Sequence, residues 1–234
     1  MPKLDVVDLG RLSWAQSWSI QQDYVEKRKA GLVPDTLLFV EHPHVITLGR
    51  NASESNILTS RELLAQLGVS IHEANRGGDV TYHGPGQLVG YPIFDLAPWK
   101  KDVRAYVQAI EQSIIRTLAG FGIAAHTRDG KETGVYVSNA DQAPAKICAL
   151  GVHISRWVSS HGFALNLNPD LSYFQHIVPC GLTLPVTSMS ELGVQADRTE
   201  VMRLIARHLA EIFNHDFSNS IEHLSIENLE EMLP

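Results

Sequence analysis

The spacing of apolar residues predicts two long helices, one over residues 102–119 and one over residues 201–212. In both segments the apolar residues recur every three or four positions, so they share one face. Three further helices are predicted from capping pairs, in which a serine or threonine stands three positions before glutamate or glutamine. These pairs are Ser13 with Gln16, Thr59 with Glu62 and Ser188 with Glu191, and their helices are expected to end at Gly31, Gly68 and Gly193.

Short runs of β-branched and other large apolar residues predict strands between these helices. The first run, residues 6–9, is expected at the edge of a sheet. Lys146 heads a run over residues 146–154, which is expected to pair with residues 162–167 across a hairpin near residues 158–160. The other predicted strands are residues 37–40, 45–48, 69–74, 88–96, 123–126 and 134–137.

The chain shows no internal repeat, low-complexity tract or interdomain linker. Strands and helices alternate irregularly, so we expect a single α+β domain over residues 1–234. The last segment, about residues 215–234, has five acidic residues and no lysine or arginine. This acidic tail is expected to form a short helix or to fray.

Composition narrows the class of protein. The net charge of −7, with few lysines and arginines, argues against general nucleic-acid binding. The two cysteines form no CxxC pair, so neither a disulfide framework nor a structural zinc site is expected. The start lacks an apolar signal core, and no run of roughly 18 apolar residues occurs, so we expect a cytoplasmic protein.

Residues 76–87, RGGDVTYHGPGQ, contain four glycines and a proline, which predict a long loop. Glycines let main-chain N–H groups approach a ligand closely, so the loop is a candidate cradle for a carbonyl or phosphate group. The alternative is a rigid surface turn. The spacing matches neither the dinucleotide fingerprint nor the P-loop, so no nucleotide is implied.

Two residues are candidates for nucleophilic chemistry. Cys180 stands between Pro179 and Gly181, outside any periodic element, where a reactive thiol and an inert one are about equally compatible with the sequence. Lys146 heads an apolar strand and could stabilise a thiolate and exchange a proton with it, although a surface lysine is the simpler interpretation. Such a cysteine–lysine pair would suit acyl transfer from a thioester.

Cys148 is a second candidate thiol. On a strand it would point to the same side as Lys146, while its apolar neighbours favour a packing role. The eleven histidines include the close pairs His42 with His44 and His153 with His161. No HExxH or GxSxG motif occurs, so metal binding and serine hydrolysis are only weakly supported.

Several motifs together point to a known family. The glycine-rich segment continues into LVGYP at residues 88–92, and EHP at residues 41–43 precedes TLG at 47–49. The remaining motifs are KI at 146–147 before Gly151, HGFALN at 161–166 and PCG at 179–181. Over residues 5–213 the chain resembles the lipoyl(octanoyl) transferases, which are the octanoyltransferases of lipoate biosynthesis.

The resemblance implies a fold and a reaction. The fold would be a domain of mixed β-sheets flanked by helices, as in the catalytic domains of biotin and lipoate protein ligases. The reaction would move an octanoyl group from octanoyl-acyl carrier protein to a cysteine thioester, and then to a lysine ε-amine. The acceptors would be lipoyl domains of 2-oxoacid dehydrogenase complexes and the glycine-cleavage H protein. No metal, ATP or other cofactor is implied, and a monomer is expected.

The resemblance also implies the site. Cys180 would carry the acyl group, and Lys146 would lower its pKa and handle the proton. The substrate-binding residues would be Arg76, Gly77, Gly78, Asp79, Val80, Thr81, Tyr82, His83, Ala149, Leu150, Gly151, Gly162, Phe163 and Ala164. The chain departs from the family pattern at Cys148, where a small apolar residue is common, and at His44, where proline is common.

Two rival interpretations stay open. An ATP-dependent lipoate or biotin ligase would share the fold, but the PCG motif and the lack of a GRGR run argue against it. A non-catalytic module that binds lipoyl domains or carrier proteins would not need Cys180. Because the carrier and acceptor domains are generally acidic, docking is expected to use basic residues around the site, namely Arg50, Arg76, Lys100, Lys101, Arg128 and Lys131.

Overall fold

The computed structural model describes residues 1–128, 133–138, 144–178 and 184–224. Its strands form an eight-stranded sheet in the order β11-β1-β2-β6-β10-β9-β8-β7 and a three-stranded sheet in the order β4-β3-β5. The strands are β1 (Leu4–Arg11), β2 (Asp35–Glu41), β3 (Val45–Leu48), β4 (Ser70–Glu73), β5 (Val80–His83), β6 (Gln87–Ile93), β7 (Ala125–His126), β8 (Gly134–Val137), β9 (Ala145–Ser155), β10 (Val158–Asn166) and β11 (Glu222–His223). The helices are α1 (Trp14–Lys29), α2 (Arg61–Gln66), α3 (Val103–Gly120) and α4 (Arg198–Phe213), with short 3-10 turns η1 (Glu54–Asn56) and η2 (Leu171–His176).

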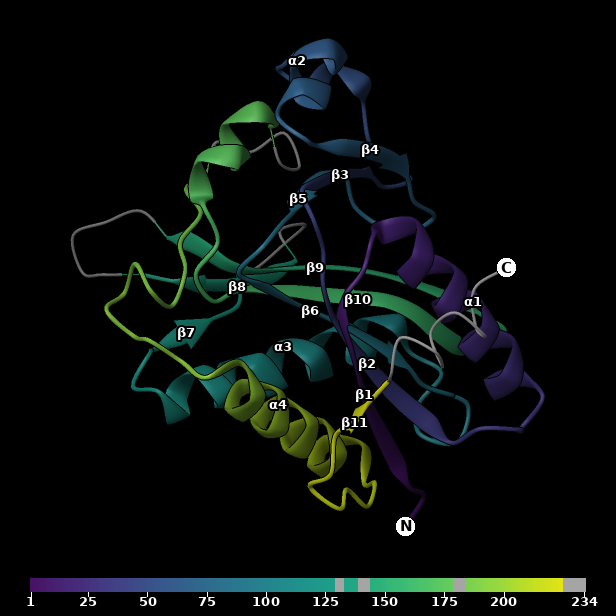
Figure 1. The fold of residues 1–234 in the computed structure, drawn as a ribbon. Coiled ribbons are helices and arrows are strands. Elements are labelled where there is room, and N and C mark those ends of the chain that lie inside the picture. The colour runs from purple at the N-terminus through teal and green to yellow at the C-terminus, as the bar shows by residue number, and fades with distance from the viewer. Residues whose placement is uncertain (129–132, 139–143, 179–183, 225–234) are drawn as a thin grey trace.

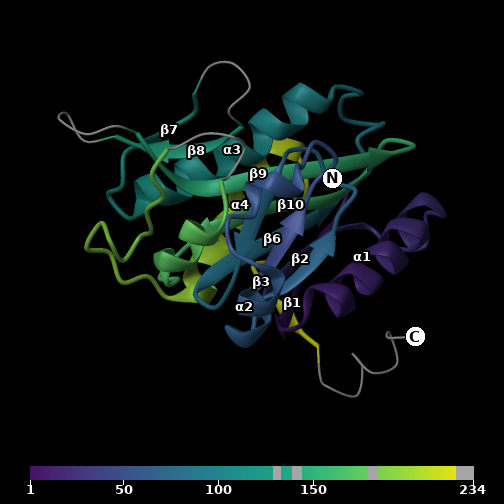
Figure 2. The ribbon, with the colours of Figure 1, turned by 90° about the horizontal axis from the view of Figure 1, so that it is seen from above.

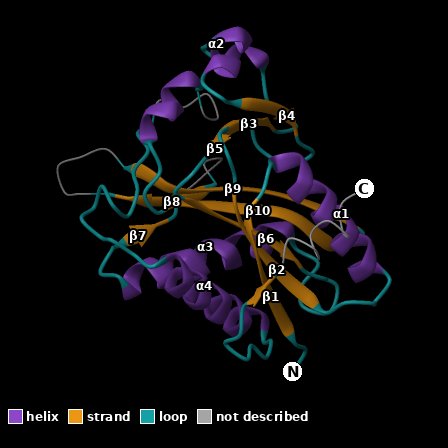
Figure 3. Cartoon of the chain, in the orientation of Figure 1, coloured by secondary structure: helices purple, strands orange, loops and turns teal. Residues whose placement is uncertain are grey.

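The elements form layers around the large sheet (Figure 1). Helices α3 and α4 cover one face, while α1 and the small sheet with α2 lie over the other, as the view from above also shows (Figure 2). Strand β1 runs parallel to β2 and β11, and the pairs from β2 through β6, β10, β9, β8 and β7 are antiparallel. The sheet is therefore mixed, and the predicted α+β class is confirmed (Figure 3).

The long helices form where the sequence places them. The Asp102 carboxylate caps α3 by accepting the backbone N–H of Ala105, and the Ser13–Gln16 capping box opens α1. The apolar faces of α3 and α4 are buried in one core with the near side of the large sheet. No helix within the described ranges is long and apolar enough to cross a membrane.

The prediction of a loop over residues 76–87 is wrong at the centre of this segment, where residues 80–83 form β5. Val80 and Tyr82 point into a buried cluster beneath the small sheet, and β5 pairs with β3 in antiparallel register. The alternation of these two apolar residues outweighs the glycine pairs around them, because a neighbouring strand supplies hydrogen-bond partners. The glycine pairs on either side of β5 remain loops.

Three other predictions need local correction. Strand β1 is longer than predicted and does not lie at the sheet edge, because β11 pairs with its outer side. The hairpin between β9 and β10 turns at Arg156 and Trp157, which have φ angles of 50° and 65°, so β10 begins at Val158. Positive φ at non-glycine residues has no clear sequence signal, so the sequence predicts the turn at a later position.

Two of the predicted short helices also differ. Ser60 caps α2, since its hydroxyl accepts the N–H of Leu63, while the Thr59 hydroxyl lies 2.8 Å from Nδ1 of His176. After Ser188 the chain makes a hydrogen-bonded turn and no helix. Glycine at position 193, with φ of 80°, ends that turn before a second one can form.

The predicted turn at residues 128–131 and the predicted helix of the acidic tail fall largely on residues 129–132 and 225–234, outside the described residues. The described start of the tail contributes β11 to the large sheet. The extent of one domain over residues 1–234 stays a prediction.

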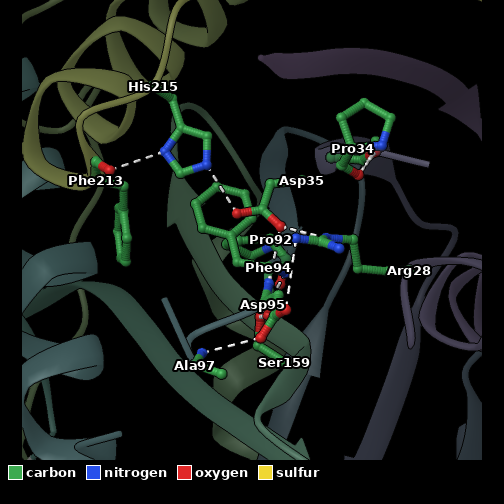
Figure 4. A network of polar contacts seen from close by, with 11 residues as sticks. Arg28, Pro34, Asp35, Pro92, Phe94, Asp95, Ala97, Ser159, Phe213 and His215 are labelled. Atoms are coloured by element: carbon green, nitrogen blue, oxygen red, sulfur yellow. Dashed lines mark hydrogen bonds and ion pairs between the residues drawn. The ribbon is translucent and has the colours of Figure 1, made fainter. Parts of the chain in front are cut away.

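The carboxylate of Asp35 joins elements that are distant in sequence (Figure 4). Its Oδ1 accepts from Nε of Arg28 at 2.6 Å and from the backbone N–H of Asp95 at 2.8 Å. Its Oδ2 lies 2.8 Å from Nε2 of His215, just after α4. Asp35 is buried, so these groups lose partners in a low-dielectric setting if the carboxylate is removed.

We expect Asp35→Ala to lower the free energy of unfolding by about 3 kcal/mol, because it leaves buried polar groups without their partner. Urea denaturation measures this. The matched control is Glu54→Ala, which removes a salt bridge to Arg61. The side chains of Glu54 and Arg61 are 74% and 58% exposed. That control should change stability by less than about 1 kcal/mol. Equal effects of the two substitutions would contradict the role given to Asp35.

Candidate functional site

A cavity of about 320 Å³ lies between the glycine-rich segment and the large sheet. One wall comes from residues 76–83, and the other comes from β9 and β10, with Val89 and Tyr91 of β6. Of the predicted site residues, the cavity wall contains Arg76, Gly77, Gly78, Asp79, Val80, Thr81, His83, Lys146, Ala149, Leu150, Gly151, Gly162, Phe163 and Ala164. The structure thus brings together three motifs that are far apart in the sequence.

Small residues on two strands make the floor of the cavity. Gly151 lies opposite Gly162 in the sheet register, and Ala149 lies opposite Ala164. The glycine-rich loop touches this floor, since the N–H of Gly77 donates to the carbonyl of Val152 at 2.9 Å. A Cβ on Gly151 would lie 2.9 Å from the carbonyl oxygen of Gly77, so only glycine permits this approach.

Arg76 anchors the loop from inside the protein. It is 8% exposed, and its Nη2 donates to the carbonyl and hydroxyl oxygens of Thr47 at 2.7 and 2.9 Å. Nη1 donates to the carbonyl of Gly77 at 3.1 Å. The prediction that Arg76 is a docking residue for acidic partners is wrong, because its guanidinium is buried and bonded within the protein.

Two buried histidines, His83 and His161, line the cavity, and a third, His42, lies beside His83. Burial lowers the pKa of His83 to about 3, and electrostatic interactions with His42 and Arg76 act in the same direction. Burial also lowers the pKa of His161 to about 3, and the charge of Arg76 acts in the same direction. Burial lowers the pKa of His42 to about 4. All three rings are therefore neutral at neutral pH.

Each of these rings has a defined partner. Nδ1 of His83 lies 3.2 Å from Oε1 of Gln87, and Nε2 of His42 lies 2.8 Å from the hydroxyl of Tyr91. Nε2 of His161 lies 2.6 Å from Oδ1 of Asn75. Within the residues that the structure describes, no three His, Cys, Asp or Glu side chains gather as metal ligands do.

Lys146 lies on β9 at the boundary of the cavity. Its Nζ donates to the carbonyl of Thr133 at 3.3 Å and lies 5.3 Å from the centre of the Tyr136 ring. Its backbone N–H donates to the carbonyl of Pro185 at 2.8 Å, and its own carbonyl accepts from Thr187 at 3.0 Å. Lys146 is therefore fixed beside the chain that follows the PCG motif.

Cys180 falls in residues 179–183, outside the described residues. The chain on either side of that segment is close to the cavity wall. The N–H of Val178 donates to the carbonyl of Asn56 at 2.8 Å, and Nδ2 of Asn56 donates to the Asp79 carboxylate at 2.6 Å. After the segment, the chain runs beside Lys146.

Comparisons with known proteins agree with this arrangement. A family model described as the lipoyl protein ligase A/B catalytic domain matches residues 13–210. The octanoyltransferase of Solibacter usitatus is 56% identical over 208 residues, which cover 89% of this chain and 92% of that protein. The chain belongs to this family, among its octanoyltransferases. The resemblance found in the sequence motifs is confirmed.

Solved structures show that the octanoyltransferase chain has the ligase fold. A bi-partite lipoate protein ligase from Thermoplasma acidophilum matches with a TM-score of 0.73 at 15% identity, over 98% of this chain and 90% of that one. A biotin protein ligase from Aquifex aeolicus matches with a TM-score of 0.52 at 14% identity, over 92% and 70% of the two chains. The fold implied by the resemblance is confirmed.

The second thiol of this family member, Cys148, lies in the core. It is fully buried in the cluster that faces α3 and α4, and it is not among the residues that line the cavity. Burial raises its pKa well above the usual range, and the Glu111 charge adds to this, while Lys146 acts in the opposite direction. This setting favours the packing role over the role of nucleophile.

Tyr82 is placed differently from the other predicted site residues. It lies in the core beneath the small sheet, and its hydroxyl lies 2.8 Å from Nδ1 of His44. Cavity residues that the sequence did not single out include Trp14, Val89, Tyr91, Val103 and Val107. The alternation of Val89 and Tyr91 along the strand after the glycine-rich motif was a usable signal, whereas Trp14 had none.

We expect the buried histidines to make the protein sensitive to acid. The pKa of His83 is about 3 in the folded protein against an ordinary value of 6.5, so the unfolded chain takes up a proton first as pH falls below 6.5. Stability is therefore lost towards low pH. In His83→Gln, the dependence of unfolding free energy on pH should be shallower by about 1.4 kcal/mol per pH unit between pH 6 and 5.

Urea unfolding at several pH values measures this slope. The control is His126→Gln, which replaces an exposed histidine of β7 and should leave the slope unchanged. Parallel stability curves for wild type and His83→Gln would show that His83 takes up protons in the folded protein as readily as in the unfolded chain.

Proposed function

We propose that this protein moves an octanoyl group from octanoyl-acyl carrier protein to a lysine ε-amine on lipoyl domains, through a thioester on Cys180. The observation that carries the proposal is the cavity between the glycine-rich loop and strands β9 and β10, with Lys146 at its boundary. Its relatives at high identity are octanoyltransferases, which supports the same acyl group here.

The walls of the cavity suit an alkyl chain. Ala149, Ala164 and Val89 present small apolar side chains, and Leu150 and Phe163 add larger ones. Burying each methylene of an acyl chain in such a site contributes about 0.8 kcal/mol. The two histidines that line the cavity are neutral, so they add no charge beside the guanidinium of Arg76, which is bonded to Thr47.

The proposed first half-reaction loads the enzyme. The Cys180 thiolate attacks the carbonyl carbon of the octanoyl thioester, the bond to the carrier sulfur breaks, and the carrier thiolate takes a proton from the Lys146 ammonium as it leaves. The Lys146 ammonium would stabilise the thiolate before attack. Main-chain N–H groups would stabilise the tetrahedral oxyanion, but the N–H of Gly77 already donates to Val152, so other donors are required.

The proposed second half-reaction unloads it. Loading leaves Lys146 as a neutral amine with no thiolate beside it, so it can accept the proton that the attacking lysine of the lipoyl domain loses. The amide forms as the C–S bond breaks, and Cys180 leaves as a thiolate beside the reprotonated Lys146. Amide formation from a thioester is downhill, so the proposed reaction uses no ATP.

Docking of the acidic carrier and acceptor domains would use basic residues near the cavity. Lys100 and Lys101 are exposed just before α3, whose residues Val103 and Val107 line the cavity. Arg50 is exposed beside His153, with Nη2 2.9 Å from Nδ1. Lys131 lies outside the described residues.

An ATP-dependent lipoate ligase is the alternative, because a lipoate-protein ligase A bound with ATP has the same fold with a TM-score of 0.75. Incubation with ATP and free octanoate, in the absence of carrier protein, separates the two functions. The transferase should leave lipoyl domains unmodified under these conditions, whereas a ligase should acylate them.

We expect Cys180→Ala to abolish covalent acylation, because it removes the proposed nucleophile. Cys148→Ala is the matched control and should retain most activity, since the Cys148 thiol is buried and has a raised pKa. Intact-mass analysis after mixing with octanoyl-acyl carrier protein detects the adduct. Peptide mapping that places the octanoyl group on Cys148 would contradict the assignment.

We expect Lys146→Arg to separate the two half-reactions. Arginine keeps a positive charge beside the thiol but stays protonated at working pH, so it cannot act as a base. Self-acylation of Cys180 should persist in part, while transfer to the lipoyl domain is lost, and Lys146→Met should impair both steps. Single-turnover measurement of each half-reaction tests this. Transfer by Lys146→Arg at the wild-type rate would disprove the general-base role.

A further inference from the structure

One peptide unit links Lys146 to a buried carboxyl group on α3. The carbonyl of Thr133 accepts from Nζ of Lys146 at 3.3 Å. The N–H of the same peptide, on Gly134, donates to Oε1 of Glu111 at 3.0 Å. The C=O and N–H of a trans peptide point in opposite directions in one plane. Glu111 and Lys146 therefore hold the two sides of a single planar group.

Glu111 is unusual for its position. It is 6% exposed and lies on α3, which contacts β8 and β9. A buried carboxyl group on an apolar face is unfavourable unless it has a specific partner. Burial raises the pKa of Glu111, and the hydrogen bond from Gly134 opposes that shift. The described partner of Glu111 is thus the peptide that Lys146 contacts.

The backbone at Gly134 allows this arrangement only without a side chain. Its φ is 145°, and a Cβ there would lie 2.9 Å from the carbonyl oxygen of Cys148 and 3.2 Å from Cε of Lys146. The lysine stem therefore passes directly over Gly134. Two positions further along β8, Tyr136 pairs with Lys146 across the strands.

We propose that Glu111 is a positioning residue for Lys146 and acts through the Thr133–Gly134 peptide. Its carboxyl group fixes the plane of the peptide so that the carbonyl faces the lysine, and it polarises that carbonyl through the shared peptide. The carbonyl then holds Nζ at the cavity boundary and favours its protonated form. The catalytic use of Lys146 rests on the proposed function, whereas the link from Glu111 to Lys146 does not.

The first measurement is independent of the acyltransfer reaction. Competitive labelling with trace acetic anhydride, followed by peptide mass spectrometry, reports how readily the Lys146 amine reacts, relative to the exposed Lys27. In Glu111→Gln the amide oxygen can still accept from Gly134, but the charge is gone. We expect Lys146 to react about threefold faster at pH 8 in this variant, and faster still in Glu111→Ala.

Ser113→Ala is the control, because it also removes a buried polar group from α3. The Ser113 hydroxyl donates to the carbonyl of Ile110 within the same helix. It should leave the labelling of Lys146 unchanged. If Glu111→Ala does not fold, Glu111→Gln alone carries the test. Wild-type labelling of Lys146 in folded Glu111→Gln would overturn the proposal.

The second measurement is single-turnover transfer from octanoyl-enzyme to a lipoyl domain. We expect the rate at saturating acceptor to fall about tenfold in Glu111→Ala, with the half-saturating acceptor concentration unchanged. Glu111→Gln should recover part of the rate, because it keeps the hydrogen bond. Altered labelling with an unaltered transfer rate would support the positioning of Lys146 and would contradict its role as the base in the proposed function.

Discussion

Hydrogen bonds of two consecutive residues, Arg76 and Gly77, connect the two sheets of this protein beside its cavity. Arg76 reaches into the small sheet at Thr47, while the next residue, Gly77, bonds to Val152 on the large sheet. A buried cation is tolerated only when its donors are satisfied. The start of the glycine-rich loop is thereby bonded to both sheets, beside the cavity that the loop lines.

The same constraint shapes the chemistry around the cavity. Burial lowers the pKa of His83 and His161, and the charge of Arg76 acts in the same direction, so the cavity wall carries polar but uncharged rings there. Lys146 instead lies at the boundary, held by the Thr133 carbonyl and close to the Tyr136 ring. An apolar interior beside a cation at the boundary suits a substrate with an alkyl chain and a reacting carbonyl.

Sequence patterns predicted the parts of the fold that local chemistry decides. The capping box at Ser13 and the N-cap at Asp102 placed the starts of α1 and α3, because these side chains bond to the first turn of their own helix. Strand β5 was missed, because its pairing with β3 depends on a contact with a segment more than thirty residues away. The hairpin turn was misplaced, because Arg156 and Trp157 adopt positive φ without glycine.

The candidate site likewise divides into features that the local sequence shows and features that depend on contacts between distant segments. Motifs identified most of the cavity wall, because residues that approach a ligand closely must be small or glycine, and such residues are visible in a sequence. Glu111 could not be singled out, since one glutamate in an amphipathic helix is normally solvent-exposed. The role of Glu111 is visible only in the folded protein, where α3 packs beneath β8 and the Glu111 carboxyl group accepts from the N–H of Gly134.

The central claim is that the acyl chain occupies the cavity between the glycine-rich loop and the large sheet. An isotope-edited NOE experiment on protein acylated with ¹³C-labelled octanoyl groups tests it most directly. The account predicts NOEs from the octanoyl chain to the methyl groups of Ala149, Ala164 and Val89, which line the cavity. NOEs only to exposed apolar residues elsewhere, such as Leu63 and Leu67 at α2, would contradict it.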